Sequence, residues 1–139
     1  MQASFNEKQT KANVRHYFDK ELPRLILQSG YSQNEIRSSH LSLAPSFGIN
    51  LNDRSEDIIL NSMEAQEIVK GTLRAINLCH DPYRKILLNV YINEASNNNV
   101  QALLGYSHAQ YNRLKGKAFI CFADAFSNIK DLRVYECLK

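Results

Sequence analysis

The 139-residue chain has few cysteines and no long apolar run, and both shortages exclude classes of protein. Its three cysteines are odd in number and never stand in a Cys-x-x-Cys spacing, which argues against a disulfide framework and a zinc site. The longest unbroken apolar run, residues 118–123, is far shorter than the roughly 20 residues of a membrane helix, and no apolar stretch opens the chain. We therefore expect a cytoplasmic protein that binds no membrane, metal or cofactor.

The sequence also lacks the short motifs of common enzymes. It contains no phosphate-binding loop, no Gly-x-Ser-x-Gly motif and no paired carboxylates suited to a pocket. His16 and His80 are more typical of packed or solvated histidines than of metal ligands, and Cys79 beside His80 has no second pair to complete a site. We predict no catalytic residue and no enzymatic activity.

Acidic side chains are missing from one stretch of the chain, between Glu94 and Asp124. The total of 17 Lys and Arg against 14 Asp and Glu gives a net charge of +3, which is too small to indicate a partner. Residues 1–82 carry 9 basic and 10 acidic side chains, whereas residues 83–139 carry 8 and 4, so the basic excess is C-terminal. A solvated helix face and a nucleic-acid-binding surface both fit this distribution.

Apolar residues recur at helical spacing through most of the chain, which predicts an all-α fold. The N-terminal helical segment, residues 1–37, should contain a helix over about 6–29 that Pro23 kinks or breaks and Gly30 ends. Ser32 and Glu35 have the spacing of a capping box for a short helix. Residues 38–55 lose the periodicity and collect Ser, Asn, Pro and Gly, which predicts an irregular linker.

Residues 56–139 are predicted to form a second, helical domain. It begins with a long helix whose N-terminal half is crowded with carboxylates that complement the helix dipole. Asp81 and Pro82 are typical of an N-cap and a first helical position, which predicts a helix from Pro82 to about Asn93. The tail, residues 127–139, has a mixed pattern without strand alternation, and we expect it to be helical.

Two helices at about residues 96–122 carry the functional prediction. Ser96 can cap the first, Gly105 can end it in the left-handed conformation, and Ser107 can cap the second after a tight turn. Apolar residues such as Tyr111 would hold the second helix to the domain, while its remaining face is basic and free of acid. This is the sequence form of a helix-turn-helix, whose second helix enters the DNA major groove.

The residue types on that second helix suit DNA. Arg binds guanine bidentately, Gln or Asn binds adenine and Lys mainly contacts phosphate, so Arg113 and Gln110 are candidates to define part of a site. Asn97 and Asn98 are candidates to bind the phosphate backbone, although a run of asparagines also fits a plain polar surface. We expect an outward face of His108, Gln110, Asn112, Arg113 and Lys117, and the full predicted set of DNA contacts adds Asn97, Asn98, Ser107, Ala109 and Lys115.

These motifs resemble those of known DNA-binding proteins. Residues 82–126 are similar to the C-terminal helix-turn-helix of bacterial sigma factors, through Leu104-Gly105-Tyr106-Ser107, Tyr111, Arg113-Leu114-Lys115, Lys117-Ala118 and Phe122-Ala123. Most of the chain resembles the ArpU/RinA/LtrC-like phage transcriptional regulators, through Thr10-Lys11, Asn13-Val14-Arg15, Leu22-Pro23-Arg24-Leu25, the Pro45 to Gly48 linker and the long helix. The resemblance implies a protein of a phage, prophage or phage-derived island in a Gram-positive host that activates late packaging and morphogenesis genes by binding promoter DNA.

The resemblance to sigma factors also implies roles for single residues. His108, Ala109 and Arg113 would lie nearest the bases, and Gln110, Asn112 and Lys117 nearer the backbone. The sequence departs from the sigma pattern at Gly116, where Ala is typical, and at Ala109, which lacks the polar side chain expected of a base reader.

Two other functions remain open at this point. The sigma-like domain would serve as a binding module for host RNA polymerase or another phage protein, or the chain would be a DNA-packaging recognition subunit. Apolar stripes on the N-terminal helix and on the helix around Ile59 to Ile76 fit either a homodimer interface or packing within one chain.

Overall fold

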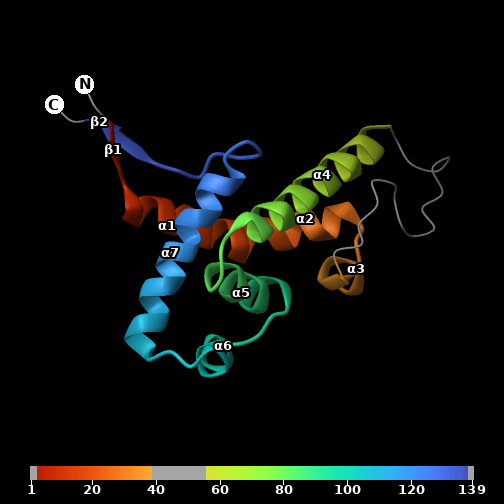
Figure 1. The fold of residues 1–139 in the computed structure, drawn as a ribbon. Coiled ribbons are helices and arrows are strands. Elements are labelled where there is room, and N and C mark those ends of the chain that lie inside the picture. The colour runs from red at the N-terminus through yellow and green to blue at the C-terminus, as the bar shows by residue number, and fades with distance from the viewer. Residues whose placement is uncertain (1–2, 39–55, 138–139) are drawn as a thin grey trace.

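The structure is a computed structural model that describes residues 3–38 and 56–137. Helices make up most of this part of the chain, as predicted, and one pair of short strands accompanies them (Figure 1). The predicted linker, residues 38–55, lies outside the described residues except for Ser38.

The first predicted helix is interrupted, as its proline suggested. Helix α1 spans Glu7–His16, a single π-helical turn, η1, spans Tyr17–Glu21, and α2 spans Leu22–Ser29. Pro23 follows the π turn directly: the Leu22 amide still donates to the Tyr17 carbonyl, so the backbone stays helical through η1 and the proline removes only the hydrogen bond of its own amide. Gly30 then ends α2 with a φ of 79°, a left-handed conformation that glycine adopts without steric cost.

The next two helices also follow the sequence prediction. The Ser32 amide donates to Glu35 Oε1 and the Glu35 amide donates to Ser32 Oγ, both at 3.1 Å, so the predicted capping box is confirmed. It opens the short helix α3, Gln33–Ser38, which buries Ile36. Helix α4 spans Glu56–Leu78 and is the longest helix described.

The predicted cap at Asp81 is wrong. Helix α5 spans Tyr83–Leu87 and continues as a π-helical turn, η3, over Leu88–Ile92, so the helix begins one residue later than expected. Pro82 occupies the cap position, and the Asp81 carboxylate instead accepts two hydrogen bonds from the Arg84 guanidinium, at 3.1 and 3.2 Å. A bidentate ion pair with Arg84 therefore replaces the expected bond to the helix amides.

The prediction that the C-terminal tail is helical is wrong, because the tail ends in a short strand. Strand β2, Tyr135–Cys137, pairs antiparallel with β1, Ala3–Phe5, in a register that places Phe5 opposite Tyr135 (Figure 1). Next to this pair, the Val134 carbonyl accepts from the Asn6 amide at 2.8 Å and the Val134 amide donates to Thr10 Oγ1 at 3.0 Å. The partner of the tail lies at the other end of the sequence, so local periodicity gave no sign of this strand.

The N-terminal and C-terminal segments share one hydrophobic core. Helix α7, His108–Phe126, crosses α1, while α2 runs along α4 (Figure 1). Phe122 of α7 lies between Phe18 and Phe126, with ring centroids 4.6 and 4.9 Å away. The same cluster contains Val14 of α1 and Val69 of α4, so residues on both sides of the predicted linker pack together.

A buried hydrogen bond fixes α4 to the first helical segment. The Tyr17 and Thr72 side chains are fully buried, and their oxygens lie 2.7 Å apart. Since the Thr72 hydroxyl donates to the Ile68 carbonyl at 2.8 Å, the Tyr17 hydroxyl is the donor to Thr72. Burial raises the pKa of Tyr17, so this hydroxyl stays protonated.

We expect Thr72→Val to lower the free energy of unfolding by about 1–3 kcal/mol, because it leaves the buried Tyr17 hydroxyl without an acceptor. Urea denaturation followed by circular dichroism measures this loss. Tyr17→Phe in the Thr72→Val background is the control, and it should restore part of the stability because no buried donor then remains. Equal stability of the two variants would contradict this role of Thr72.

Candidate nucleic-acid interface

The two helices of the predicted helix-turn-helix are joined by a three-residue turn. Helix α6 spans Asn97–Leu104 and α7 begins at His108. Gly105 has a φ of 75°, and its amide donates to the Ala102 carbonyl at 3.2 Å. The Tyr106 amide donates to the Gln101 carbonyl at 3.2 Å, which completes the Schellman motif that ends α6. The predicted left-handed stop at Gly105 is confirmed.

Serine caps begin both helices, as predicted. Ser96 Oγ accepts from the Asn99 amide at 3.1 Å, and Ser107 Oγ accepts from the Gln110 amide at 3.2 Å. A second, smaller core cluster of Ile86, Val100 and Tyr111 attaches both helices to α5, with Tyr106 and Leu114 packed against it. The angle between α6 and α7 is therefore set by two caps, one glycine and a small apolar cluster.

One face of α7 is exposed and carries part of the predicted DNA contacts. Ala109, Arg113 and Lys117 recur every four residues, and Gln110 lies beside them. All four are exposed, and within the described residues the side chains of Gln110, Arg113 and Lys117 form no hydrogen bond or ion pair. We call these four residues the outer face of α7.

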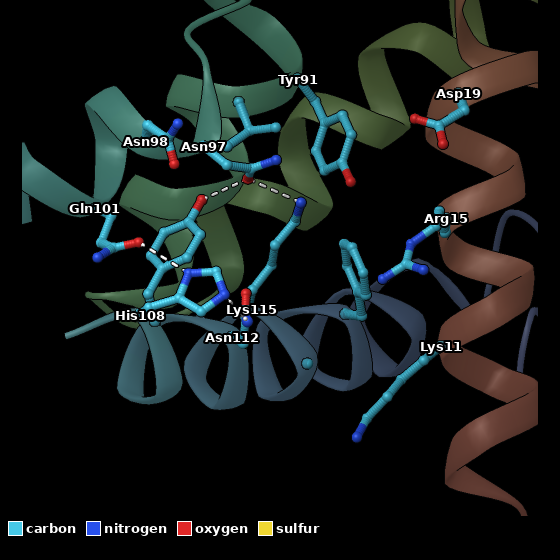
Figure 2. Close-up of a pocket in the computed structure, with 14 residues that line it drawn as sticks. Lys11, Arg15, Asp19, Tyr91, Asn97, Asn98, Gln101, His108, Asn112 and Lys115 are labelled. Atoms are coloured by element: carbon cyan, nitrogen blue, oxygen red, sulfur yellow. Dashed lines mark hydrogen bonds between the residues drawn. The ribbon is translucent and has the colours of Figure 1, made fainter. Parts of the chain in front are cut away.

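The remaining predicted residues of α7 turn to a different side of the helix. We expected His108 and Asn112 on the same face as Arg113, but they line a cleft between α1, α6 and α7 together with Lys115 (Figure 2). The spacing of four and three residues from His108 to Lys115 explains this, because it keeps the three side chains on one face of an α-helix. Asn97 and Asn98 of α6 also line this cleft, which we call the α1–α6–α7 cleft.

Lys115 and Asn97 bind each other across the cleft. Lys115 Nζ donates to Asn97 Oδ1 at 2.9 Å, and the Tyr111 hydroxyl donates to the same oxygen at 2.7 Å (Figure 2). Lys115 Nζ also lies 5.6 Å from the ring centroid of Tyr91 and 5.7 Å from that of Phe119. Burial lowers the pKa of Lys115, and the nearby positive charge of Arg15 lowers it further. Both residues thus stabilise the packing of α6 on α7, and a contact of either with DNA stays a prediction.

His108 is also held by neighbours on both sides. Its Nδ1 lies 3.4 Å from Gln101 Oε1, and its Nε2 lies 3.1 Å from Asn112 Nδ2. A neutral ring with its proton on Nδ1 satisfies both contacts, since it donates to Gln101 and accepts from Asn112. His108 and Asn112 would have to give up these contacts to bind DNA, whereas Arg113 would not. That His108 and Asn112 contact DNA therefore stays a prediction of its own.

The sequence prediction missed the contribution of α1 to this region. Lys11 and Arg15 extend from α1 toward α7 and line the cleft, and Asp19 of η1 lies beside them (Figure 2). The Arg15 guanidinium carbon is 5.8 Å from the ring centroid of Phe119, on α7. The spacing of four residues between Lys11 and Arg15 was the available signal for a basic stripe on α1, but it did not indicate which helix this stripe would face.

Gly116 allows Lys11 to cross close to α7. A methyl group at position 116 would lie 3.2 Å from Lys11 Nζ and 3.3 Å from its Cε. The Lys11 side chain therefore passes directly over position 116 of α7. This contact gives a structural reason for the glycine that departs from the sigma-factor pattern.

We expect Gly116→Ala to raise the free energy of unfolding by about 0.5–1 kcal/mol. Alanine is favoured over glycine in a helix interior by about that amount, and the contacting atoms are the end of a flexible lysine that can move. Gly105→Ala is the matched control: nothing lies within 4 Å of the added methyl, but the φ of 75° is strained for alanine. It should lower stability by about 1–2 kcal/mol in the same urea titration. A Gly116→Ala variant less stable than wild type would mean that Lys11 is fixed in place.

The described part of the chain contains neither a metal site nor a membrane-spanning helix. No group of three or more His, Cys, Asp or Glu residues is placed to hold a metal ion there. Nor does any helix among these residues have the length and apolar character needed to cross a membrane.

Comparisons with known proteins leave the resemblance stated above as a prediction. No family model, no curated protein and no solved structure matches this chain.

Proposed function

We propose that this protein is a sequence-specific DNA-binding transcriptional regulator whose helix α7 enters the major groove. The observation that carries the proposal is the outer face of α7, the second and serine-capped helix of the pair, whose polar side chains have no partner among the described residues. The resemblance to phage regulators extends the proposal to its target, the promoters of late phage or phage-island genes, which it would activate.

The residue chemistry assigns each part of the interface a role. Arg113 can donate two hydrogen bonds to guanine, and Gln110 can pair with the edge of adenine. Lys117, one turn further along α7, supplies positive charge to a phosphate. The first amides of α7 point out of the helix beyond the Ser107 cap, where the helix dipole favours a phosphate. Ala109 offers only a methyl contact, so base reading depends mainly on Arg113 and Gln110.

The experiment that tests this function begins without a known operator. The protein is used to enrich duplexes from a random-sequence library, and the enriched duplex is then footprinted at several salt concentrations. A discrete footprint is expected, together with an affinity that falls with salt by a slope of about 0.9 per contacted phosphate. Equal, weak binding to every duplex would exclude sequence-specific regulation.

A second function is favoured by one apolar side chain. Leu103 lies on the exposed side of α6, the first helix of the predicted helix-turn-helix, with 72% of its surface accessible. A contact with RNA polymerase or another protein would cover it, and the module would then reach promoter DNA only through that partner. Capture of purified polymerase by wild type but not by Leu103→Ser, in the absence of DNA, would support this alternative.

A further inference from the structure

The α1–α6–α7 cleft is large enough to receive a ligand. Its volume is about 680 Å³, within the range of small-molecule sites, and it is partly open to solvent. Aromatic rings of Tyr91 and Phe119 form part of its wall, and side-chain amides of Asn98 and Gln101 lie at its other end.

Positive charge dominates the polar groups of this cleft. Lys11, Arg15 and Lys115 are its cations, and Asp19 is the one carboxylate among its described lining residues. Arg15 and Lys115 both lie over the Phe119 ring, at 5.8 and 5.7 Å from its centroid. Glu7 offsets the positive charge of Lys11 only weakly, because Lys11 Nζ and Glu7 Oε2 lie 4.0 Å apart on the surface of α1.

The surroundings of Lys115 also indicate charge that is not neutralised. Burial and the charge of Arg15 lower the pKa of Lys115, whereas Asp19 raises it less. Two like charges in a partly buried cleft repel each other, and a bound anion would relieve both the repulsion and the loss of hydration.

We propose that the α1–α6–α7 cleft binds a ligand with several phosphate groups, which contacts Arg15 and Lys115 on the two sides of Phe119 and Lys11 at the rim. A phosphate suits three cations from two helices because it carries more than one charge and several acceptor oxygens. The amides of Asn98 and Gln101 lie where they would bind the remainder of an organic phosphate.

This site adjoins the outer face of α7, since Lys11 and Asn112 line both the cleft and a second pocket that contains Arg113 and Lys117, but Arg15 and Lys115 line only the cleft. His108, Lys115 and Phe119 line the cleft, whereas Ala109, Arg113 and Lys117 lie on another side of the same helix. The phosphate therefore has two possible sources: a free phosphorylated small molecule, or the backbone of a nucleic-acid strand that passes between α1 and α6.

Binding of inorganic tripolyphosphate, measured by calorimetry, tests the site. Arg15→Gln and Lys115→Met should each weaken binding about 10- to 100-fold, the usual effect of losing a hydrogen bond to a charged group. Lys20→Gln is the matched control, because it removes one positive charge from the adjoining turn η1 at an exposed position outside the cleft. Lys115→Met keeps the aliphatic stem and leaves Asn97 Oδ1 bonded to Tyr111, so the fold should persist, as circular dichroism will check.

Competition with the enriched duplex separates the two sources. Displacement of tripolyphosphate by duplex, with weaker duplex binding by Arg15→Gln, identifies a backbone phosphate; binding that duplex does not displace identifies a free ligand. The proposal is overturned if wild type does not bind tripolyphosphate, or if Lys20→Gln loses as much affinity as Arg15→Gln. Loss of duplex binding in outer-face variants alone would support DNA recognition independently of the cleft, so the two proposals can fail separately.

Discussion

Arg113→Ala should weaken binding to the enriched duplex about 10- to 100-fold and leave binding to a scrambled duplex much less affected. Arg113 is exposed at the centre of the outer face of α7 and has no partner among the described residues, so its guanidinium is free to bind a base. A bidentate contact with guanine is worth roughly 1–3 kcal/mol of discrimination, which sets the size of the effect. Titration of labelled duplexes at a fixed salt concentration measures both affinities.

Two further variants show whether the effect of Arg113→Ala comes from base reading. Arg74→Ala, on the exposed side of α4, removes the same charge far from α7 in sequence and should change neither affinity appreciably. Lys117→Ala should weaken binding to both duplexes alike and lower the salt slope by about 1, as expected for a phosphate contact. If Arg113→Ala behaves like Arg74→Ala, α7 does not read DNA through this face.

Phe122→Ala should lower the free energy of unfolding by about 3–5 kcal/mol, the usual cost of removing a buried phenyl ring. Phe122 is fully buried, and its ring lies 4.6 Å from Phe18 and 6.0 Å from Tyr17, so the cavity would open between η1 and α7. Because these residues belong to one core cluster, the N-terminal and C-terminal segments should lose stability together.

Urea denaturation followed by two probes tests this expectation. Far-ultraviolet circular dichroism reports the helices, and tyrosine fluorescence reports the core, because the chain has seven Tyr and no Trp. The two curves should coincide for wild type and for Phe122→Ala. Leu103→Ala, at an exposed position, is the control and should change stability by less than about 0.5 kcal/mol. Separate transitions would mean that the segments on either side of residues 39–55 fold independently.

Features decided by neighbouring residues could be predicted from the sequence. The capping box at Ser32, the caps at Ser96 and Ser107 and the stop at Gly105 each depend on residues within one helical turn. A side chain three residues from an unpaired amide meets it whatever the rest of the fold does. These local signals were enough to predict where α6 begins and ends and where α7 begins, whereas α7 runs to Phe126, beyond the predicted end at about residue 122.

Features decided by distant segments could not be predicted in the same way. The tail forms a strand because Ala3–Phe5 lies beside it, and nothing within residues 127–139 encodes that neighbour. Lys115 was identified as basic, but its inward position depends on Asn97, which lies 18 residues earlier, and on the rings of Tyr91 and Phe119. The cleft itself needs α1, so only the packing of the whole chain reveals it.

The shape of the cleft depends on the number of residues in the two π-helical turns, η1 and η3. Phe18 belongs to η1 and Tyr91 to η3, and their rings stack with centroids 4.2 Å apart and an angle of 7°. A π turn closes its hydrogen bond one residue later than an α turn, so each turn accommodates one residue more than regular helix. Loss of a single residue from either turn would let it close as a regular α turn, which keeps the helix that follows in register but redirects side chains within the turn, such as Phe18 or Tyr91. In related chains, insertions and deletions at these two turns would therefore reshape the cleft more than most substitutions.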